Sequence, residues 1–150
     1  MSATVPPLTG HLDGAIRNGR HHMQIRVYYE DTDFSGVVYH ASYLRFMERG
    51  RTEMLRARGI DQGAILAGDK GERFGFAVRA MTVDFRRPAR MDDLLTVETE
   101  VVEIGGASME LAQRVRRGDE LLISATVRIA CVADGRPCRI PAAIRASLGF

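Results

Sequence analysis

Two carboxylates, Asp31 and Asp33, stand two residues apart in the segment 28–40, which also contains Gly36 and ends at His40. A carboxylate can take a proton from water or attack a carbonyl carbon, and a histidine can assist proton transfer. Glycine lets the backbone turn and come close to a substrate. These residue types, in this order, favour acyl transfer, in which a base or nucleophile acts on a carbonyl carbon.

Two simpler roles for the carboxylates stay open. Asp side chains before a glycine often make turn hydrogen bonds, so Asp31 and Asp33 could serve loop geometry alone. With Ser35 and Gly36 they also match positions 1, 3, 5 and 6 of an EF-hand calcium loop. Position 12 of that loop requires a bidentate Glu and is Ser42 here, and a strand pattern precedes the loop. Calcium binding is therefore disfavoured.

A long helix is predicted directly after this segment, over residues 41–58, with Ser42 as its N-cap and Gly59 as its left-handed C-terminal residue. Its apolar face is formed by Tyr43, Phe46, Met47, Met54 and Leu55. Gly50 lies on the same face, which we explain by a close approach of the helix to a sheet. Unpaired N–H groups at the helix start favour a negatively charged oxygen, so a carboxylate and an oxyanion site become neighbours.

The rest of the chain has mainly the period of β-strands. Strands are expected at residues 23–29, 76–86, 95–101, 109–115 and 121–132, with turns at 105–106 and 117–119. A helical turn is expected within residues 61–73, and a helical tail at 140–150. The order is a strand, the helix and a four-stranded antiparallel meander. The apolar face of the sheet and the apolar face of the helix can be buried only against each other. This predicts an α+β fold with one curved sheet wrapped around one central helix.

Length and composition fit a single domain, because 45% of the 150 residues are hydrophobic. We assign residues 1–22 to an N-terminal extension, either mobile or folded onto a partner, and residues 23–150 to the domain. A net charge of +2 does not indicate a nucleic-acid partner. Cys131 and Cys138 lack the further ligands of a zinc site, so we expect reduced thiols and no metal. The sequence contains neither a membrane span nor a signal peptide, so a cytoplasmic location is expected.

Three motifs carry a resemblance to a known family, and they are RVYYEDTD at residues 26–33, GVVYHASY at 36–43 and ERGRTEMLR at 48–56. With residues 81–83 and 88–93 they resemble the hotdog-fold acyl-CoA thioesterases of the 4-hydroxybenzoyl-CoA thioesterase type. Within that family the sequence is most similar to the thioesterases associated with the bacterial Tol-Pal envelope system. The resemblance covers residues 23–140.

The resemblance implies a hotdog fold and hydrolysis of acyl-CoA to a free acid and CoA. It implies that Asp33 is the general base or nucleophile and that His40 takes part through its side chain or its backbone N–H. The expected substrate-binding residues are Gly36, Val38, Tyr39 and Ala41, with the backbone of residues 38–41 as the oxyanion site. Coenzyme A is part of the substrate, and no other cofactor is implied. A homodimer or homotetramer with the active site between subunits is also implied.

Several alternatives stay open. Asp33 could activate water or attack the thioester to give a mixed anhydride, and the acyl group is undetermined. Arg86, Arg87 and Arg90 could hold the phosphates of coenzyme A, although a chain with 20 arginines forms such clusters by chance. Rival functions are a hotdog dehydratase that acts on 3-hydroxyacyl thioesters, and a binding or scaffold protein of the Tol-Pal or phospholipid-synthesis machinery with weak hydrolysis.

Overall fold

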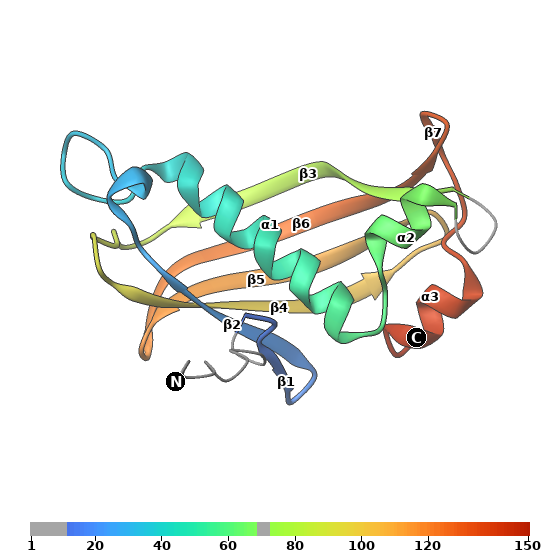
Figure 1. Ribbon diagram of the computed structural model, residues 1–150, viewed down its shortest axis with the longest axis horizontal. Helices are drawn as coiled ribbons and strands as arrows, with labels where there is room; N and C mark the ends of the chain where they lie inside the picture. The colour runs from blue at the N-terminus through green and yellow to red at the C-terminus, as the bar shows by residue number, and fades with distance from the viewer. Residues whose placement is uncertain (1–11, 69–72) are drawn as a thin grey trace, which may run out of the picture.

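The computed structural model describes residues 12–68 and 73–150. One long helix, α1 (His40–Ala57), lies across one face of an antiparallel sheet (Figure 1). The strands are β1 (Ala15–Arg17), β2 (Arg20–Arg26), β3 (Gly75–Phe85), β4 (Leu94–Ile104), β5 (Ser108–Arg117), β6 (Glu120–Ala133) and β7 (Arg136–Pro137). The shorter helices are η1 (Tyr29–Asp31), α2 (Gln62–Ala67) and α3 (Ala142–Ser147). The predicted α+β class, with a sheet around one central helix, is confirmed.

The strand order in the sheet is β1-β2-β4-β5-β6-β3, and β7 pairs with β6. The predicted hairpins from β4 to β5 and from β5 to β6 are confirmed. The prediction of a continuous four-stranded meander is wrong, because β3 pairs with β6 at the sheet edge and not with β4. Alternating apolar residues show which side of a strand is buried, but they do not show which strand lies beside it.

A hairpin of β1 and β2 precedes the boundary that we predicted at residue 23. Its turn is Asn18-Gly19, with φ angles of 53° and 74°, as a two-residue hairpin turn requires. Residues 15–22 therefore belong to the sheet, and their assignment to a mobile extension is wrong. An Asn-Gly pair is a strong hairpin signal, which our interpretation of the sequence missed. Residues 1–11 of the predicted extension lie outside the described residues.

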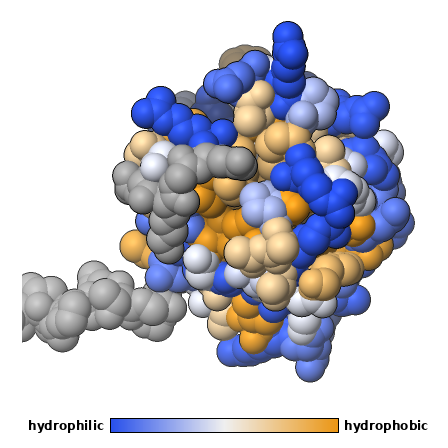
Figure 2. Space-filling view, turned by 90° about the vertical axis from the view of Figure 1, so that its right-hand side faces the viewer, coloured by the Kyte–Doolittle hydropathy of each residue, from blue (hydrophilic) through white to orange (hydrophobic). Residues whose placement is uncertain are grey.

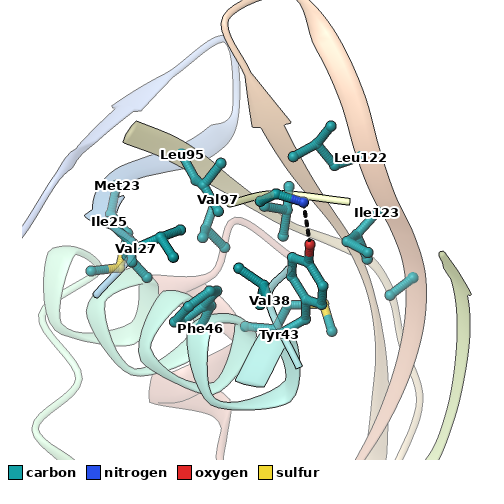
Figure 3. Packing of buried hydrophobic residues seen from close by; sticks show 14 residues of the cluster. Met23, Ile25, Val27, Val38, Tyr43, Phe46, Leu95, Val97, Leu122 and Ile123 are labelled. Atoms are coloured by element: carbon teal, nitrogen blue, oxygen red, sulfur yellow. Dashed lines mark hydrogen bonds between the residues drawn. The ribbon is translucent and has the colours of Figure 1, made fainter. Parts of the chain in front are cut away.

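Helix α1 buries its apolar face against the sheet, as predicted. Figure 3 shows Tyr43 and Phe46 packed among side chains that include Leu95 and Ile123. Gly50 lies so close to the sheet that an added Cβ would stand 2.8 Å from the Cγ1 atom of Val97. The explanation of Gly50 by close approach is confirmed, since no side chain fits there without movement.

A second apolar cluster packs the C-terminal segment onto the sheet at the right-hand end in Figure 1. Ile144 and Leu148 of this segment are buried, and the predicted helical tail is confirmed as α3. Some apolar surface stays open at this end, mixed with hydrophilic side chains (Figure 2). Among the described residues, no helix is both long and apolar enough to cross a membrane.

The two cysteines lie side by side in this cluster. Their Sγ atoms are 3.0 Å apart, and both thiols are free. Burial, followed by the hydrogen bond with Cys138, raises the pKa of the Cys131 thiol to about 12. The Cys131 thiol is therefore protonated at neutral pH, which makes it a poor nucleophile.

Candidate active site

The loop between β2 and α1, at the left of Figure 1, folds back on itself to present Asp33. The Asp33 N–H donates to the carbonyl oxygen of Val37 at 2.9 Å, and the Gly36 N–H donates to the carbonyl oxygen of Asp33 at 3.0 Å. Gly36 has a φ of 83°, which glycine adopts without strain. The predicted role of Gly36 in turning the loop agrees with this geometry, while its contact with a substrate stays a prediction.

Asp31 holds the loop to the helix. Its carboxylate accepts the Tyr28 N–H at 2.8 Å, and its carbonyl oxygen accepts the Tyr39 N–H at 2.9 Å and the Ser42 hydroxyl at 3.1 Å. The helix therefore begins at His40 with Tyr39 in the N-cap position. The prediction that Ser42 is the N-cap is wrong, because its hydroxyl binds Asp31 and its N–H already bonds within the first turn.

The Asp33 carboxylate is exposed, and only its Oδ1 atom has a partner within the described part of the chain. Oδ1 accepts the Ser35 hydroxyl at 2.5 Å and the Ser35 N–H at 2.8 Å. These two hydrogen bonds, the side-chain one first, lower the pKa of Asp33, and the nearby His40 lowers it further. Asp33 is therefore ionised at neutral pH, and its Oδ2 atom is available to water or to a carbonyl carbon.

The oxyanion donors are fewer than predicted. The Val38 N–H donates to the carbonyl oxygen of Ala89 at 2.8 Å, and the Tyr39 N–H donates to Asp31. Including these two N–H groups in the oxyanion site was wrong, because they are already bonded. The His40 and Ala41 N–H groups, in the first turn of α1, have no acceptor among the described residues. They are two donors at the positive end of the helix dipole.

Ala89 and Tyr43 support the helix start, and the sequence analysis assigned them no such role. The Ala89 N–H donates to the Tyr43 hydroxyl at 2.9 Å (Figure 3), while its carbonyl oxygen accepts the Val38 N–H. Burial raises the pKa of Tyr43, so this hydroxyl stays protonated. Residues 86–93, which link β3 to β4, thus brace the end of the loop. The sequence indicates Tyr43 only as part of the apolar helix face, because hydrophobic periodicity does not show which group its hydroxyl binds.

A cavity of about 250 Å³ opens beside His40, and its lining includes Tyr43, Phe85 and Pro88. The His40 ring is exposed, with its centroid 4.5 Å from that of Tyr39 and 6.1 Å from that of Phe85. The cavity is thus mainly apolar and lies next to the free N–H groups of the helix start. An apolar group attached to a carbonyl could lie in this cavity with the carbonyl oxygen near those N–H groups.

Two of the three clustered arginines border this cavity. Arg86 and Arg87 are lining residues, whereas Arg90 is not. Arg86 forms an ion pair with Asp84 at 2.9 Å, and Arg87 forms one with Glu120 at 3.2 Å. Both pairs are exposed, and exposed pairs contribute little stability, so an incoming anion could compete for these arginines.

The geometry disfavours a metal. The carboxylates of Asp31 and Asp33 accept hydrogen bonds from different partners within the loop, the N–H groups of Tyr28 and Ser35. In residues 12–68 and 73–150 no group of three or more His, Cys, Asp or Glu side chains could hold a metal ion. The groups that the described residues offer at this site are the Asp33 carboxylate, the His40 imidazole and two backbone N–H donors.

The comparison with protein families identifies the chain. The model of the family described as "Thioesterase superfamily" matches residues 35–124. The chain belongs to this superfamily. Its sequence is 45% identical over 125 residues to the acyl-CoA thioesterase YbgC of Haemophilus influenzae, over 82% of this chain and 90% of that protein.

Solved structures of thioesterases have the same fold. A probable thioesterase from Bartonella henselae is 46% identical, with a TM-score of 0.79 over 81% of this chain and 99% of that chain. A thioesterase from Thermus thermophilus, complexed with coenzyme A and Zn, is 26% identical, with a TM-score of 0.74 over 86% and 97% of the two chains. The predicted family, the hotdog fold and the assignment as a thioesterase enzyme are confirmed.

Proposed function

We propose that this thioesterase hydrolyses acyl-CoA and that Asp33 is its catalytic carboxylate. The observation that carries the proposal is an ionised, exposed Asp33 beside a helix start where the His40 and Ala41 N–H groups have no acceptor in the described chain. The name of the Haemophilus influenzae relative and the coenzyme A bound to the Thermus thermophilus relative support an acyl-CoA substrate.

The helix start polarises the thioester. The carbonyl oxygen accepts the N–H groups of His40 and Ala41, and negative charge develops on that oxygen as the carbon becomes tetrahedral. Fixed N–H donors stabilise this charge, and one donor typically contributes about 10²- to 10³-fold in rate. The imidazole of His40, on the border of the same cavity, is placed to assist proton transfer or to orient the substrate.

Asp33 acts by one of two routes. As a general base it takes a proton from water, whose oxygen adds to the carbonyl carbon; the C–S bond then breaks, and the proton leaves with the CoA thiol. As a nucleophile it attacks the carbonyl carbon, releases CoA and forms a mixed anhydride, which water hydrolyses. Both routes require the ionised carboxylate, so the lowered pKa of Asp33 supports either one.

The coenzyme A portion of the substrate extends past the border of the cavity. Arg86 and Arg87 are placed to contact its phosphates there, in exchange for their exposed pairs with Asp84 and Glu120. Arginine suits this role because its planar guanidinium binds phosphate oxygens in pairs.

The test is release of free thiol from a panel of acyl-CoAs that spans short, long and aromatic acyl groups. Wild type should hydrolyse at least one of them, and Asp33→Asn should lower turnover by about 10²- to 10⁴-fold. The variant should keep its melting temperature, since Asp33 is exposed. A wild-type protein with no activity on any acyl-CoA would refute the proposal.

The same panel tests the alternative of a binding or scaffold protein. A partner of the Tol-Pal or phospholipid-synthesis machinery with residual hydrolysis should cleave every acyl-CoA slowly. Its rates should also not change in Asp33→Asn, because no catalytic base would be lost. The association with such proteins stays a prediction of the family resemblance.

A further inference from the structure

A buried network of hydrogen bonds joins α1 to strands β4 and β5, away from the Asp33 loop. Gln113 is fully buried, and its Nε2 atom donates to the carbonyl oxygen of Met47 and to the Oγ1 atom of Thr99, both at 2.9 Å. Its Oε1 atom accepts a hydrogen bond from the guanidinium of Arg51 at 3.0 Å. Both ends of the Gln113 amide are thus engaged, so Gln113 holds Arg51 in one orientation.

Arg51 is half-buried and has spare donors. Of the 20 arginines, eight lie within 4.0 Å of a carboxylate in the described chain and twelve do not. Arg51 is one of the twelve, and its one hydrogen bond among the described residues goes to the neutral Gln113. Burial lowers the pKa of Arg51, and the charge of Glu48 opposes that effect. A partly desolvated guanidinium with unused N–H groups favours a further oxygen acceptor.

A cavity of about 170 Å³ provides room for that acceptor. Arg51 lines it together with Glu48, Thr52 and Gln62, while apolar side chains from α1, β3, β5 and β6, such as Leu55, Phe76 and Leu111, form most of its wall. The cavity is therefore suited to a mainly apolar group that carries one polar atom.

The cavity lies far from the helix start of its own chain. Arg51 lies eleven positions after His40, which corresponds to about 16 Å along α1. Strand β3 runs opposite to α1 (Figure 1), so its Phe76 lies at this cavity and its Phe85 lies at the cavity beside His40. β3 is also one of the two edge strands of the sheet. Antiparallel pairing of β3 from two copies would bring the Arg51 cavity of one copy next to the helix start of the other.

We propose that the Arg51 cavity receives the distal end of the acyl group and that Arg51 selects acyl groups bearing an oxygen acceptor there, as a hydroxyl or a carboxylate. The inference rests on the proposed acyl-CoA thioesterase function and on a dimer paired along β3. Gln113 is a positioning residue for Arg51. Glu48, exposed on the preceding turn of α1, repels a negatively charged end of the acyl group. A hydroxyl end therefore tests the hydrogen bond alone, and a carboxylate end tests the hydrogen bond together with the effect of charge.

The test compares kcat/KM for acyl-CoAs of equal chain length that end in a methyl group, a hydroxyl or a carboxylate, over a series of lengths. At the preferred length, wild type should favour the hydroxyl or the carboxylate substrate over the methyl one. Arg51→Met keeps an unbranched apolar stem and removes the guanidinium donors, so this preference should fall by about 10- to 100-fold, the range for a hydrogen bond to a charged group. Arg45→Met, at an exposed arginine of the same helix, is the matched control and should retain the preference.

Each result has a distinct meaning. Hydrolysis of the methyl series with no preference at any length overturns this inference and leaves the proposed function standing. No hydrolysis of any acyl-CoA overturns both. An equal loss on all three substrates in Arg51→Met assigns Arg51 a purely structural role and overturns the inference. If Arg51→Met lowers the melting temperature, Arg51→Gln is used instead, because glutamine offers an amide donor toward Gln113. An unchanged substrate preference in Arg51→Gln also overturns the inference.

Discussion

The carbonyl oxygen of Asp31 accepts the backbone N–H of Tyr39 at 2.9 Å, and this hydrogen bond joins the loop to the start of α1. The Asp31 carboxylate is engaged as well, because it caps the Tyr28 N–H. The Asp33 carboxylate, in contrast, bonds only to Ser35 within the described chain and leaves one oxygen open. Two carboxylates two residues apart thus have different surroundings: Asp31 is bonded within the loop, and Asp33 keeps one oxygen for the chemistry that we propose.

Asp31→Asn should therefore lower turnover much less than Asp33→Asn does. The amide oxygen of Asn can accept the Tyr28 N–H in place of the carboxylate, and the backbone carbonyl that binds Tyr39 is unchanged. Steady-state hydrolysis of the best acyl-CoA measures both variants, with melting temperatures as the control for folding. If Asp31→Asn abolishes turnover and Asp33→Asn retains it, the catalytic carboxylate has been assigned to the wrong residue.

Ser35→Ala should move the acid limb of the pH profile of kcat/KM to higher pH. A hydrogen bond to the charged form lowers a pKa, so the Ser35 hydroxyl keeps Asp33 ionised below the usual Asp value of about 3.9. Wild-type activity should persist until the pH falls through this lowered pKa. The alanine variant keeps the Ser35 N–H but loses the hydroxyl, so protonation should begin at higher pH. Ser147→Ala, at an exposed serine of α3, is the control.

Local patterns in the sequence predict α1 closely. The expected range 41–58 differs by one residue at each end from the observed His40–Ala57. A sustained 3.6-residue period and a glycine at the C-terminal position, Gly59 with a φ of 80°, explain this agreement. The start was misplaced because the carbonyl of Asp31, and not a side-chain cap, determines where the helix begins.

Long-range contacts explain what the sequence could not predict. Val38 and Ala89 are far apart in the chain, so no local pattern shows that the Val38 N–H is already bonded. β3 likewise pairs with β6, and alternating hydrophobicity does not show which strands are neighbours in a sheet. The Arg51-Gln113 contact joins a helix to a strand, and neither residue stands out from its neighbours in the sequence.

Gly50→Ala should destabilise the protein. On an exposed helix face this change would add about 1 kcal/mol of stability, but here the new Cβ would lie 2.8 Å from Val97 and 3.0 Å from Thr99. Overpacking of this kind costs about 1 to 3 kcal/mol, so thermal denaturation should show a lower melting temperature. Gly63→Ala in α2, where a Cβ meets only Asp61 at 3.3 Å, should be tolerated. An unchanged or raised melting temperature in Gly50→Ala would contradict the packing argument.

The protein should not be a monomer. Strand β3 is eleven residues long, lies at the sheet edge and exposes about half of the side chains of Val78 (49%) and Phe85 (48%). Such open edges are usually paired or covered. Light scattering should give at least twice the chain mass of 16.6 kDa. Ala80→Asp places a charge on this edge and should shift the mass toward the monomer, whereas Thr126→Asp, exposed on the interior strand β6, should not.

The last prediction separates the backbone of His40 from its side chain. His40→Ala removes the imidazole and retains the N–H, whereas His40→Pro also removes the N–H. Proline suits this position, because His40 is the first residue of α1 and Tyr39 before it is extended, with φ −61° and ψ 133°. If the His40 N–H holds the oxyanion, the proline variant should turn over about 10²- to 10³-fold more slowly than the alanine variant.

The control for this comparison is Ala142→Pro, which places proline at the first residue of α3 and should leave both the melting temperature and turnover unchanged. Steady-state kinetics on all three variants, each checked for an intact oligomer, measures the effect. Equal turnover in His40→Ala and His40→Pro would remove the His40 N–H from the oxyanion site and leave Ala41 as its donor. A large loss already present in His40→Ala would instead assign the main role to the imidazole, since alanine retains the backbone donor.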